Sequence, residues 1–272
     1  MASFNEITTQ KLYKLIGTPD CPVIIDVRID EDFDDDPRLV PTAFRYPFHD
    51  IASIGEKLCN RSVIIYCQKG LKLSQGAAAI LRNMNVKAEV LEGGQFAWRD
   101  AGMQMVSYDK VFEVNQNEPT VWVTRHRPKI DRIACPWLIR RFIDPTAQFL
   151  FVAPSQVKNV AEKFQAVPFD VEDAFLSHRG ELCTFDIMLE EFGVKNETLQ
   201  RLANIIRGAD TNKHHLAPEV AGLLAMSLGL SRLYRDDLAQ LDASMLIYDA
   251  LYRWARDAAN ESHDWASENG RS

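Results

Sequence analysis

The sequence predicts an α/β domain with a parallel sheet over residues 1–116, followed by a second, mainly α-helical domain over residues 117–272. Three observations lead to this expectation. A chain of 272 residues is longer than one typical domain and about right for two. In the first part, short β-branched apolar runs alternate with helical patterns, which is typical of α/β domains. In the second part, most apolar residues recur at spacings of three and four, which indicates helices.

Each predicted element of the first part has a local signal. Residues 23–27 and 62–66 are short β-branched apolar runs, which are typical of buried parallel strands, and 88–91 reads as a further strand. Residues 8–16 place apolar side chains on one helical face. Residues 74–83 are rich in Ala and Leu, which are strong helix formers.

The second part begins after a polar break at residues 114–119, which ends in Pro119 and is typical of a linker. A strand is expected at 120–124. The apolar spacing predicts helices after it, with residues 218–230 forming a central buried helix because that run is almost wholly apolar. The other expected helices span residues 155–164, 184–192, 197–208 and 236–260.

Composition limits the function classes. Residues 1–118 carry 13 Lys and Arg against 17 Asp and Glu, and the remainder carries 18 against 21, so neither part has the basic excess that sequence-independent nucleic-acid binding needs. No apolar run reaches the length of a membrane span, and the first ten residues lack a signal-peptide pattern. Five widely spaced cysteines without a C-x-x-C pair indicate free thiols. A cytoplasmic location is expected.

The segment from Cys67 to Lys72 carries the clearest chemistry. Cys67 ends a buried strand, and a short loop of Gln68, Lys69, Gly70, Leu71 and Lys72, the expected substrate-binding loop, leads into a helix. This order places the sulfur over backbone N–H groups at a helix N-terminus, which favour an anion. Lys69 and Lys72 add positive charge. Together these features favour the thiolate, the nucleophilic form of cysteine.

These residues resemble the active-site loop of the rhodanese family, specifically its single-domain sulfurtransferases. The resemblance covers residues 5–105 and includes four segments in order. Leu39-Val40-Pro41-Thr42-Ala43 stands where the family usually has His-Ile-Pro-Gly-Ala, so that turn departs from the pattern. The other three segments are Asp26-Val27-Arg28, the Cys67 loop, and the Gly-Gly-x-x-Ala-Trp pattern that ends at Trp98.

The rhodanese resemblance implies a sulfurtransferase in which Cys67 is the catalytic nucleophile and carries sulfur as a persulfide. The implied partners are a small anionic sulfur donor such as thiosulfate and a thiophilic acceptor, and no cofactor is implied. Related phosphatases and arsenate reductases hold their oxyanion with Cys-x5-Arg, whereas the sixth position after Cys67 is Leu73. Asp26 and Arg28 are expected to form a structural ion pair, and Trp98 is expected in the core.

The second part leaves its chemistry open. Arginines between Arg125 and Arg141 either bind an oxyanion or form a solvated face paired with Asp131 and Asp144. Residues 177–186 gather a His, a Glu, a Cys and an Asp, to which His126 or Asp131 could add a ligand. Their spacing matches no standard pattern of metal ligands, so the sequence does not show whether a metal binds here.

Residues 121–257 resemble the C-terminal domain of chromate-resistance proteins. The matching stretches are residues 127–142, the His178 segment and 208–210. This resemblance implies a link to chromate or oxidant stress, and it selects Asp131, Arg132, His178 and Asp210 as candidate site residues. It also supports an alternative function, a sensor or regulatory protein in which Cys67 is a reactive thiol.

Overall fold

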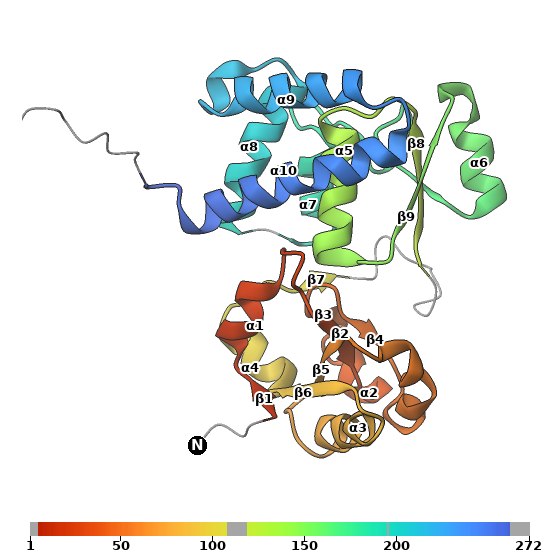
Figure 1. Cartoon of the computed structure of the whole chain (residues 1–272), viewed down its shortest axis with the longest axis vertical. Coiled ribbons are helices and arrows are strands. Elements are labelled where there is room, and N and C mark those ends of the chain that lie inside the picture. Colours follow the sequence, from red (N-terminus) through yellow and green to blue (C-terminus); the bar gives the residue numbers. More distant parts are fainter. Residues whose placement is uncertain (1–4, 108–118, 195, 262–272) are drawn as a thin grey trace, which may run out of the picture.

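The computed structural model describes residues 5–107, 119–194 and 196–261, which form two stacked lobes (Figure 1). The predicted boundary between residues 116 and 117 lies outside the described residues. Within the described ranges, no helix combines the length and the apolar character that a membrane span requires.

The first lobe contains a five-stranded parallel sheet with the strand order β1-β6-β5-β2-β4. Helices α1 and α4 cover one face of the sheet and α3 covers the other (Figure 1). This confirms the predicted parallel α/β domain. Its elements are β1 (Glu6–Ile7), α1 (Thr9–Leu15), β2 (Val23–Asp26), α2 (Asp30–Asp34), β3 (Arg38–Leu39), β4 (Phe44–Arg45), η1 (Phe48–Ile54), η2 (Glu56–Leu58), β5 (Ser62–Tyr66), α3 (Lys72–Asn83), β6 (Lys87–Leu91), α4 (Gly94–Asp100) and β7 (Val106–Ser107).

The second lobe is mixed rather than mainly helical. Three parallel strands form a small sheet in the order β10-β8-β9, and longer and shorter helices surround it. The elements are β8 (Val121–Arg125), α5 (Asp131–Leu138), η3 (Ile139–Ile143), β9 (Gln148–Val152), η4 (Pro154–Gln156), α6 (Val157–Phe164), β10 (Val167–Pro168), α7 (Thr184–Glu191), α8 (Glu197–Asp210), η5 (His214–Leu216), α9 (Val220–Leu233) and α10 (Asp237–Asp257).

Helix α5, rather than the apolar helix α9, lies at the centre of the second lobe. Seven of its eight residues are buried, and Trp137 is enclosed by aromatic rings that include Phe142 and Tyr252. The prediction that residues 218–230 form a central buried helix is wrong. Helix α9 lies on the surface, and its Leu233 side chain is 73 % exposed. An apolar run shows helix formation but does not show which partner covers it.

The two lobes share one hydrophobic core. The face of the first sheet that α1 and α4 cover is continuous with the centre of the second lobe, whereas the α3 face forms a separate cluster. Gly17 shows how closely the lobes approach, because a Cβ atom there would lie 2.6 Å from the Tyr252 ring. The shared core includes Ile7, Leu12, Ile24, Trp98, Trp122, Trp137 and Phe142.

The turn that departs from the rhodanese pattern contacts the second lobe. Thr42 has φ 67°, a conformation that β-branched residues rarely adopt and that glycine adopts readily. Its backbone N–H donates to the Phe142 carbonyl at 2.9 Å. The second lobe therefore helps to hold a backbone shape for which the family uses glycine.

Candidate functional sites

Cys67 lies directly after β5, the central strand of the first sheet. Its residue is 5 % exposed, and its Sγ atom lies 3.3 Å from the Ser74 hydroxyl on the first turns of α3. The neighbouring strand β2 ends at the same edge, where the Val27 N–H donates to the Tyr66 carbonyl. Open α/β sheets place their ligands at this carboxyl edge.

The Cys67 loop is fixed by the double glycine at the start of α4. The N–H groups of Gln95 and Phe96 donate to the carbonyls of Cys67 and Gln68, both at 3.0 Å. Gly94 has φ 61°, and a Cβ atom there would lie 2.2 Å from the Cys67 carbonyl oxygen. The two segments can approach this closely only because glycine has no side chain.

The predicted substrate loop divides into a buried and an exposed part. Gly70 is buried with φ 69°, and a Cβ atom there would lie 2.7 Å from the Leu91 carbonyl oxygen. Lys69 and Leu71 are exposed, and Lys72 is already the first residue of α3. Leu71 occupies the N-cap position, and its side chain has no atom that could accept a bond from the first turn. The N-terminal amides of α3 therefore lack a cap from this residue.

A buried ion pair supports the same edge of the sheet. Arg28 Nη2 lies 2.6 Å from Asp26 Oδ2, and both side chains are inaccessible to solvent. The guanidinium also donates to the carbonyls of Asp36 and Arg38. This confirms the predicted role of Asp26 and Arg28. A cleft of about 490 Å³ follows this edge, lined by residues that include Arg28, Arg45, Tyr46 and His49.

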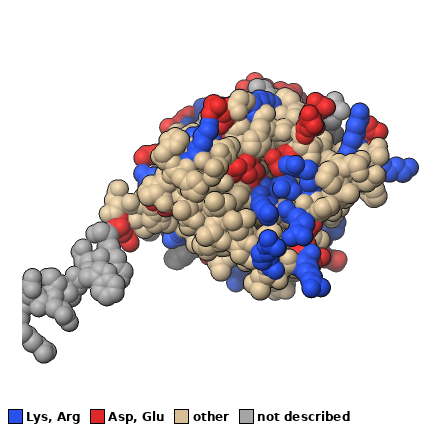
Figure 2. Space-filling model, turned by 90° about the horizontal axis from the view of Figure 1, so that it is seen from above, with Lys and Arg blue, Asp and Glu red and all other residues tan. Residues whose placement is uncertain are grey.

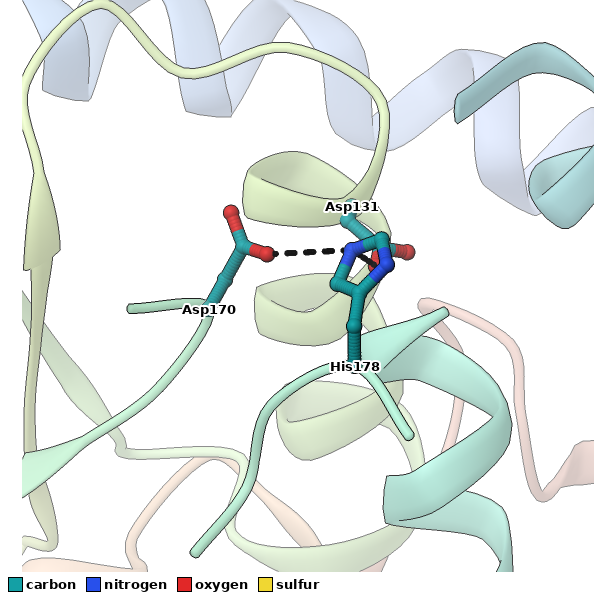
Figure 3. Close-up of side chains that lie close together, drawn as sticks. All are labelled: Asp131, Asp170 and His178. Atoms are coloured by element: carbon teal, nitrogen blue, oxygen red, sulfur yellow. Dashed lines mark ion pairs between the residues drawn. The ribbon is translucent and has the colours of Figure 1, made fainter. Parts of the chain in front are cut away.

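A second constellation, the Asp–His site, consists of Asp131, Asp170, His178 and Asp210. The Nε2 atom of His178 lies 3.4 Å from an oxygen of Asp131, 3.4 Å from one of Asp170 and 3.2 Å from one of Asp210. Figure 3 shows the His178 ring between the carboxylates of Asp131 and Asp170. The oxygens of Asp131 and Asp170 and a ring nitrogen of His178 all lie within 4.8 Å of one another.

Four separate elements contribute to the Asp–His site. Asp131 is the first residue of α5, and Asp170 follows β10. His178 lies in the loop before α7, and Asp210 is the last residue of α8. Ile130, immediately before Asp131, has φ 39°, which is rare for a β-branched residue. The shape of this chain segment is therefore maintained by its surroundings.

The electrostatics of the Asp–His site follow from its carboxylates. Hydrogen bonds to Asp131, Asp170 and Asp210 raise the pKa of His178 to about 12. Burial raises the pKa of Asp131 to about 6, and the neighbouring carboxylates of Asp210 and Asp170 act in the same direction. The pKa of Asp170 is lowered, because bonds from His178 and Thr184 outweigh the opposing effect of its burial.

Comparisons with known proteins match each lobe to a protein family. The model of the rhodanese-like domain family matches residues 8–101, and that of the "ChrB, C-terminal domain" family matches residues 122–255. The chain carries a rhodanese-like domain followed by a ChrB C-terminal domain.

Two curated relatives agree with this assignment. The chain is homologous to Protein ChrB of Cupriavidus metallidurans, with 36 % identity over 132 residues, which are 48 % of this chain and 39 % of that protein. The chain thus spans well under half the length of that relative. It is also homologous to a sulfurtransferase of Allochromatium vinosum, with 26 % identity over 104 residues, which are 38 % of this chain and 95 % of that protein.

Solved structures resemble part of the chain. A rhodanese-related protein from Thermoplasma volcanium is 18 % identical and covers 39 % of this chain and 100 % of its own, with a TM-score of 0.34. A rhodanese homolog from the extremely thermophilic bacterium Thermus thermophilus is 28 % identical and covers 34 % of this chain and 99 % of its own, with a TM-score of 0.29.

In the ChrB domain, the structure brings together all four residues that the sequence selected. Asp131, His178 and Asp210 meet directly, and Arg132 Nε contacts Asp170 at 3.2 Å. Asp170 was missed, because no element was predicted between the helices at 155–164 and 184–192. The available signal was its position directly after the short strand β10, at the end of a parallel sheet.

The other ligands considered for the ChrB domain have different roles. Cys183 is buried at the N-cap of α7, where its N–H donates to Asp186. Asp186 also pairs with Arg207, and Glu181 pairs with Lys213. These contacts account for the residues structurally.

Four of the arginines between Arg125 and Arg141 form ion pairs, although not with the predicted partners. Arg125 and Arg132 contact Asp170, whereas Asp131 and Asp144 accept other bonds. Arg140 pairs with Asp242 and Arg141 with Asp249, both on α10. Figure 2, a view of one face of the molecule from above, shows Lys and Arg side chains gathered beside acidic side chains. The face therefore has mixed charge.

Proposed function

We propose that the rhodanese-like domain is a sulfurtransferase that moves sulfane sulfur from thiosulfate, or a similar donor, to a thiophilic acceptor through a Cys67 persulfide. The observation that carries the proposal is the position of Cys67 at the carboxyl edge of β5, in a glycine-braced loop that leads into the N-terminus of α3. Homology to a sulfurtransferase supports the same reaction class.

The proposed reaction has two displacement steps. The Cys67 thiolate attacks the outer sulfur of thiosulfate, the bond to the sulfonate sulfur breaks, and sulfite leaves with the electron pair. The acceptor, cyanide or a thiolate, then attacks the terminal sulfur of the persulfide. The bond between the two sulfurs breaks, and its electron pair regenerates the Cys67 thiolate. Covalent catalysis thus divides one transfer into two steps.

The residues around Cys67 suit anionic reactants in both steps. The α3 N-terminus favours negative charge, and Lys69 and Lys72 are exposed beside the entrance to the loop. The Ser74 hydroxyl lies 3.3 Å from Sγ and donates to the Leu71 carbonyl at 3.2 Å, so it can donate to the thiolate when its proton turns from that carbonyl to the sulfur. The backbone N–H groups at the start of α3 are held in place by the fold, so they need little rearrangement as charge moves between the sulfurs.

We further propose a role in chromate resistance for the ChrB domain, on the basis of its family. The alternative function for the whole chain is a sensor in which Cys67 reacts once with an oxidant or thiophilic compound. Cys67 packs in the separate α3 cluster, but the preceding residue Tyr66 belongs to the core that the two domains share, so a change at Cys67 would reach the second domain through this strand end. Catalytic turnover distinguishes the two functions, because an enzyme transfers sulfur repeatedly, whereas the Cys67 thiol of a sensor reacts once.

The experiment is a steady-state assay of the full chain with thiosulfate as donor and cyanide as acceptor. A sulfurtransferase is expected to form many molecules of thiocyanate per chain at a constant rate. The same assay with dithiothreitol as acceptor checks that transfer does not depend on cyanide. Transfer of at most one sulfur atom per chain, as thiocyanate with cyanide and as hydrogen sulfide with dithiothreitol, would contradict the enzyme and favour the sensor.

A further inference from the structure

We infer that the ChrB domain binds a divalent first-row metal ion at the Asp–His site, with Asp131, Asp170, Asp210 and Nε2 of His178 as its ligands. The inference rests on the convergence of the four side chains, on the groups that hold them, and on a buried hydroxyl at the same end of the small sheet. It is independent of the sulfurtransferase proposal.

The spacing of the ligand atoms fits a metal ion. Three carboxylate oxygens lie 3.2–3.4 Å from Nε2 of His178. Neighbouring ligands of an octahedral ion with bonds of about 2.1 Å are about 3 Å apart. A ring N–H can point at only one of the three oxygens at a time, whereas one ion can contact Asp131, Asp170 and His178 together, because their ligand atoms all lie within 4.8 Å of one another. Asp210 lies 3.2 Å from Nε2 of His178 and would join the set by moving towards the other two carboxylates. Small side-chain movements would complete the site.

The two buried carboxylates are held by neighbouring groups, as metal ligands usually are. The oxygens that face His178, Oδ2 of Asp131 and Oδ1 of Asp170, themselves accept bonds from Thr184. Asp131 accepts a bond of 2.6 Å from the Thr184 N–H and one of 3.4 Å from the Phe185 N–H, both at the start of α7. Asp170 accepts a bond of 3.0 Å from the Thr184 hydroxyl and contacts Arg132 at 3.2 Å. These bonds fix the carboxylates without involving His178.

A separate observation comes from Thr124 near the end of β8. Its hydroxyl is buried and has no hydrogen-bond partner among the described residues. Side chains alternate along a strand, so Thr124 lies on the face of Trp122, which belongs to the core around α5, and opposite Val123, which packs with α6. The side chain of the next residue, Arg125, leaves the strand on the other face and contacts Asp170, so the end of β8 lies beside the Asp–His site. Buried hydroxyls are normally satisfied, and a water on the metal ion would supply this partner.

The negative charges of the three carboxylates also favour binding of a cation. Within the described residues, the ion pairs of Asp131 and Asp210 are both with His178, so a single imidazolium serves two carboxylates. Asp170 differs, because Arg125 and Arg132 also contact it. A divalent ion bound by neutral His178 would replace one positive charge with two. Burial makes this compensation more valuable.

The ligand types define the class of metal. Carboxylate oxygens suit Mn²⁺, imidazole suits Fe²⁺ and Zn²⁺, and no thiolate joins the set. The site has an open side, because the side chains of His178 and Asp210 are 40 % and 20 % exposed, against 1 % for Asp131. An ion can therefore enter and keep at least one water ligand.

The experiment titrates Mn²⁺ into the metal-free full chain and measures the free ion by electron paramagnetic resonance. In the wild type, one Mn²⁺ ion is expected to bind per chain. Added Zn²⁺ is expected to displace it, which raises the signal of free Mn²⁺. Asp210→Asn is expected to weaken Mn²⁺ binding at least about tenfold, the range seen when a metal site loses a supporting group. Asp242→Asn is the matched control and is expected to bind like the wild type, because the Asp242 side chain on α10 is 70 % exposed and pairs with Arg140.

Thermal unfolding provides the second readout. Mn²⁺ and Zn²⁺ are expected to raise the Tm of the wild type and of Asp242→Asn more than that of Asp210→Asn, because only binding to the folded state stabilises it. A wild type that leaves all Mn²⁺ free and shows no change in Tm with either ion would overturn the inference. Equal binding by the wild type and Asp210→Asn would remove Asp210 from the ligand set and overturn the inferred site.

Discussion

Cys67→Ser is expected to reduce thiosulfate-to-cyanide transfer by about 10³-fold or more, because a neutral hydroxyl cannot replace the thiolate that forms the persulfide. The fold should survive. The residue lies in a loop after β5, and serine is slightly smaller than cysteine. The measurement compares initial rates of thiocyanate formation with those of the wild type, with circular dichroism to confirm that the variant is folded.

The control for this variant is Cys59→Ser. Cys59 is an exposed cysteine after η2, and within the described part of the chain its Sγ atom makes one hydrogen bond, to the Gly55 carbonyl at 3.7 Å. Its replacement is expected to leave the rate unchanged. If Cys67→Ser kept the wild-type rate, or if Cys59→Ser lost it, the nucleophile would have to be assigned elsewhere.

Gly94→Ala is expected to affect both stability and sulfur transfer. Its φ of 61° is unfavourable for alanine, and the new Cβ atom would lie 2.2 Å from the Cys67 carbonyl oxygen. Relief of this overlap must move the backbone of the Cys67 loop. The free energy of unfolding is therefore expected to fall by about 1–3 kcal/mol or more. A displacement of about 1 Å at a reacting group can reduce the rate about 10²-fold.

Gly102→Ala separates backbone strain from steric overlap. Gly102 has a similar φ of 66°, but no atom lies within 4 Å of a Cβ built there. This variant is expected to lose some stability and to keep the wild-type rate. Urea unfolding and the transfer assay measure the two effects. Similar rates for Gly94→Ala and the wild type would show that the close approach of α4 to Cys67 is not needed for turnover.

The rhodanese-like domain could be predicted from sequence because its signals are local. The apolar runs of β2 and β5, the glycines around Cys67 and the Ala-rich α3 each act within a few residues. The sequence did not show that Lys72 belongs to the helix rather than to the loop. It also did not show that one face of the sheet, through Trp98 and its neighbours, would join the core of the second domain.

The ChrB domain was harder to predict because its site and its core depend on distant contacts. Strand β10 has only two residues, so periodicity could not reveal it, and Asp170 at its end was missed. Arg125 and Arg132 pair with this same Asp170, so their partners were also assigned wrongly. Asp131 and His178 were selected from resemblance alone, and the fold brings them together.

The most direct measurement is mass spectrometry of the full chain after treatment with thiosulfate, followed by peptide mapping under non-reducing conditions. The account predicts one added sulfur atom on the peptide that contains Cys67, and its removal when cyanide is added. Unmodified Cys67 in a folded chain, with thiocyanate still being formed, would contradict the persulfide mechanism.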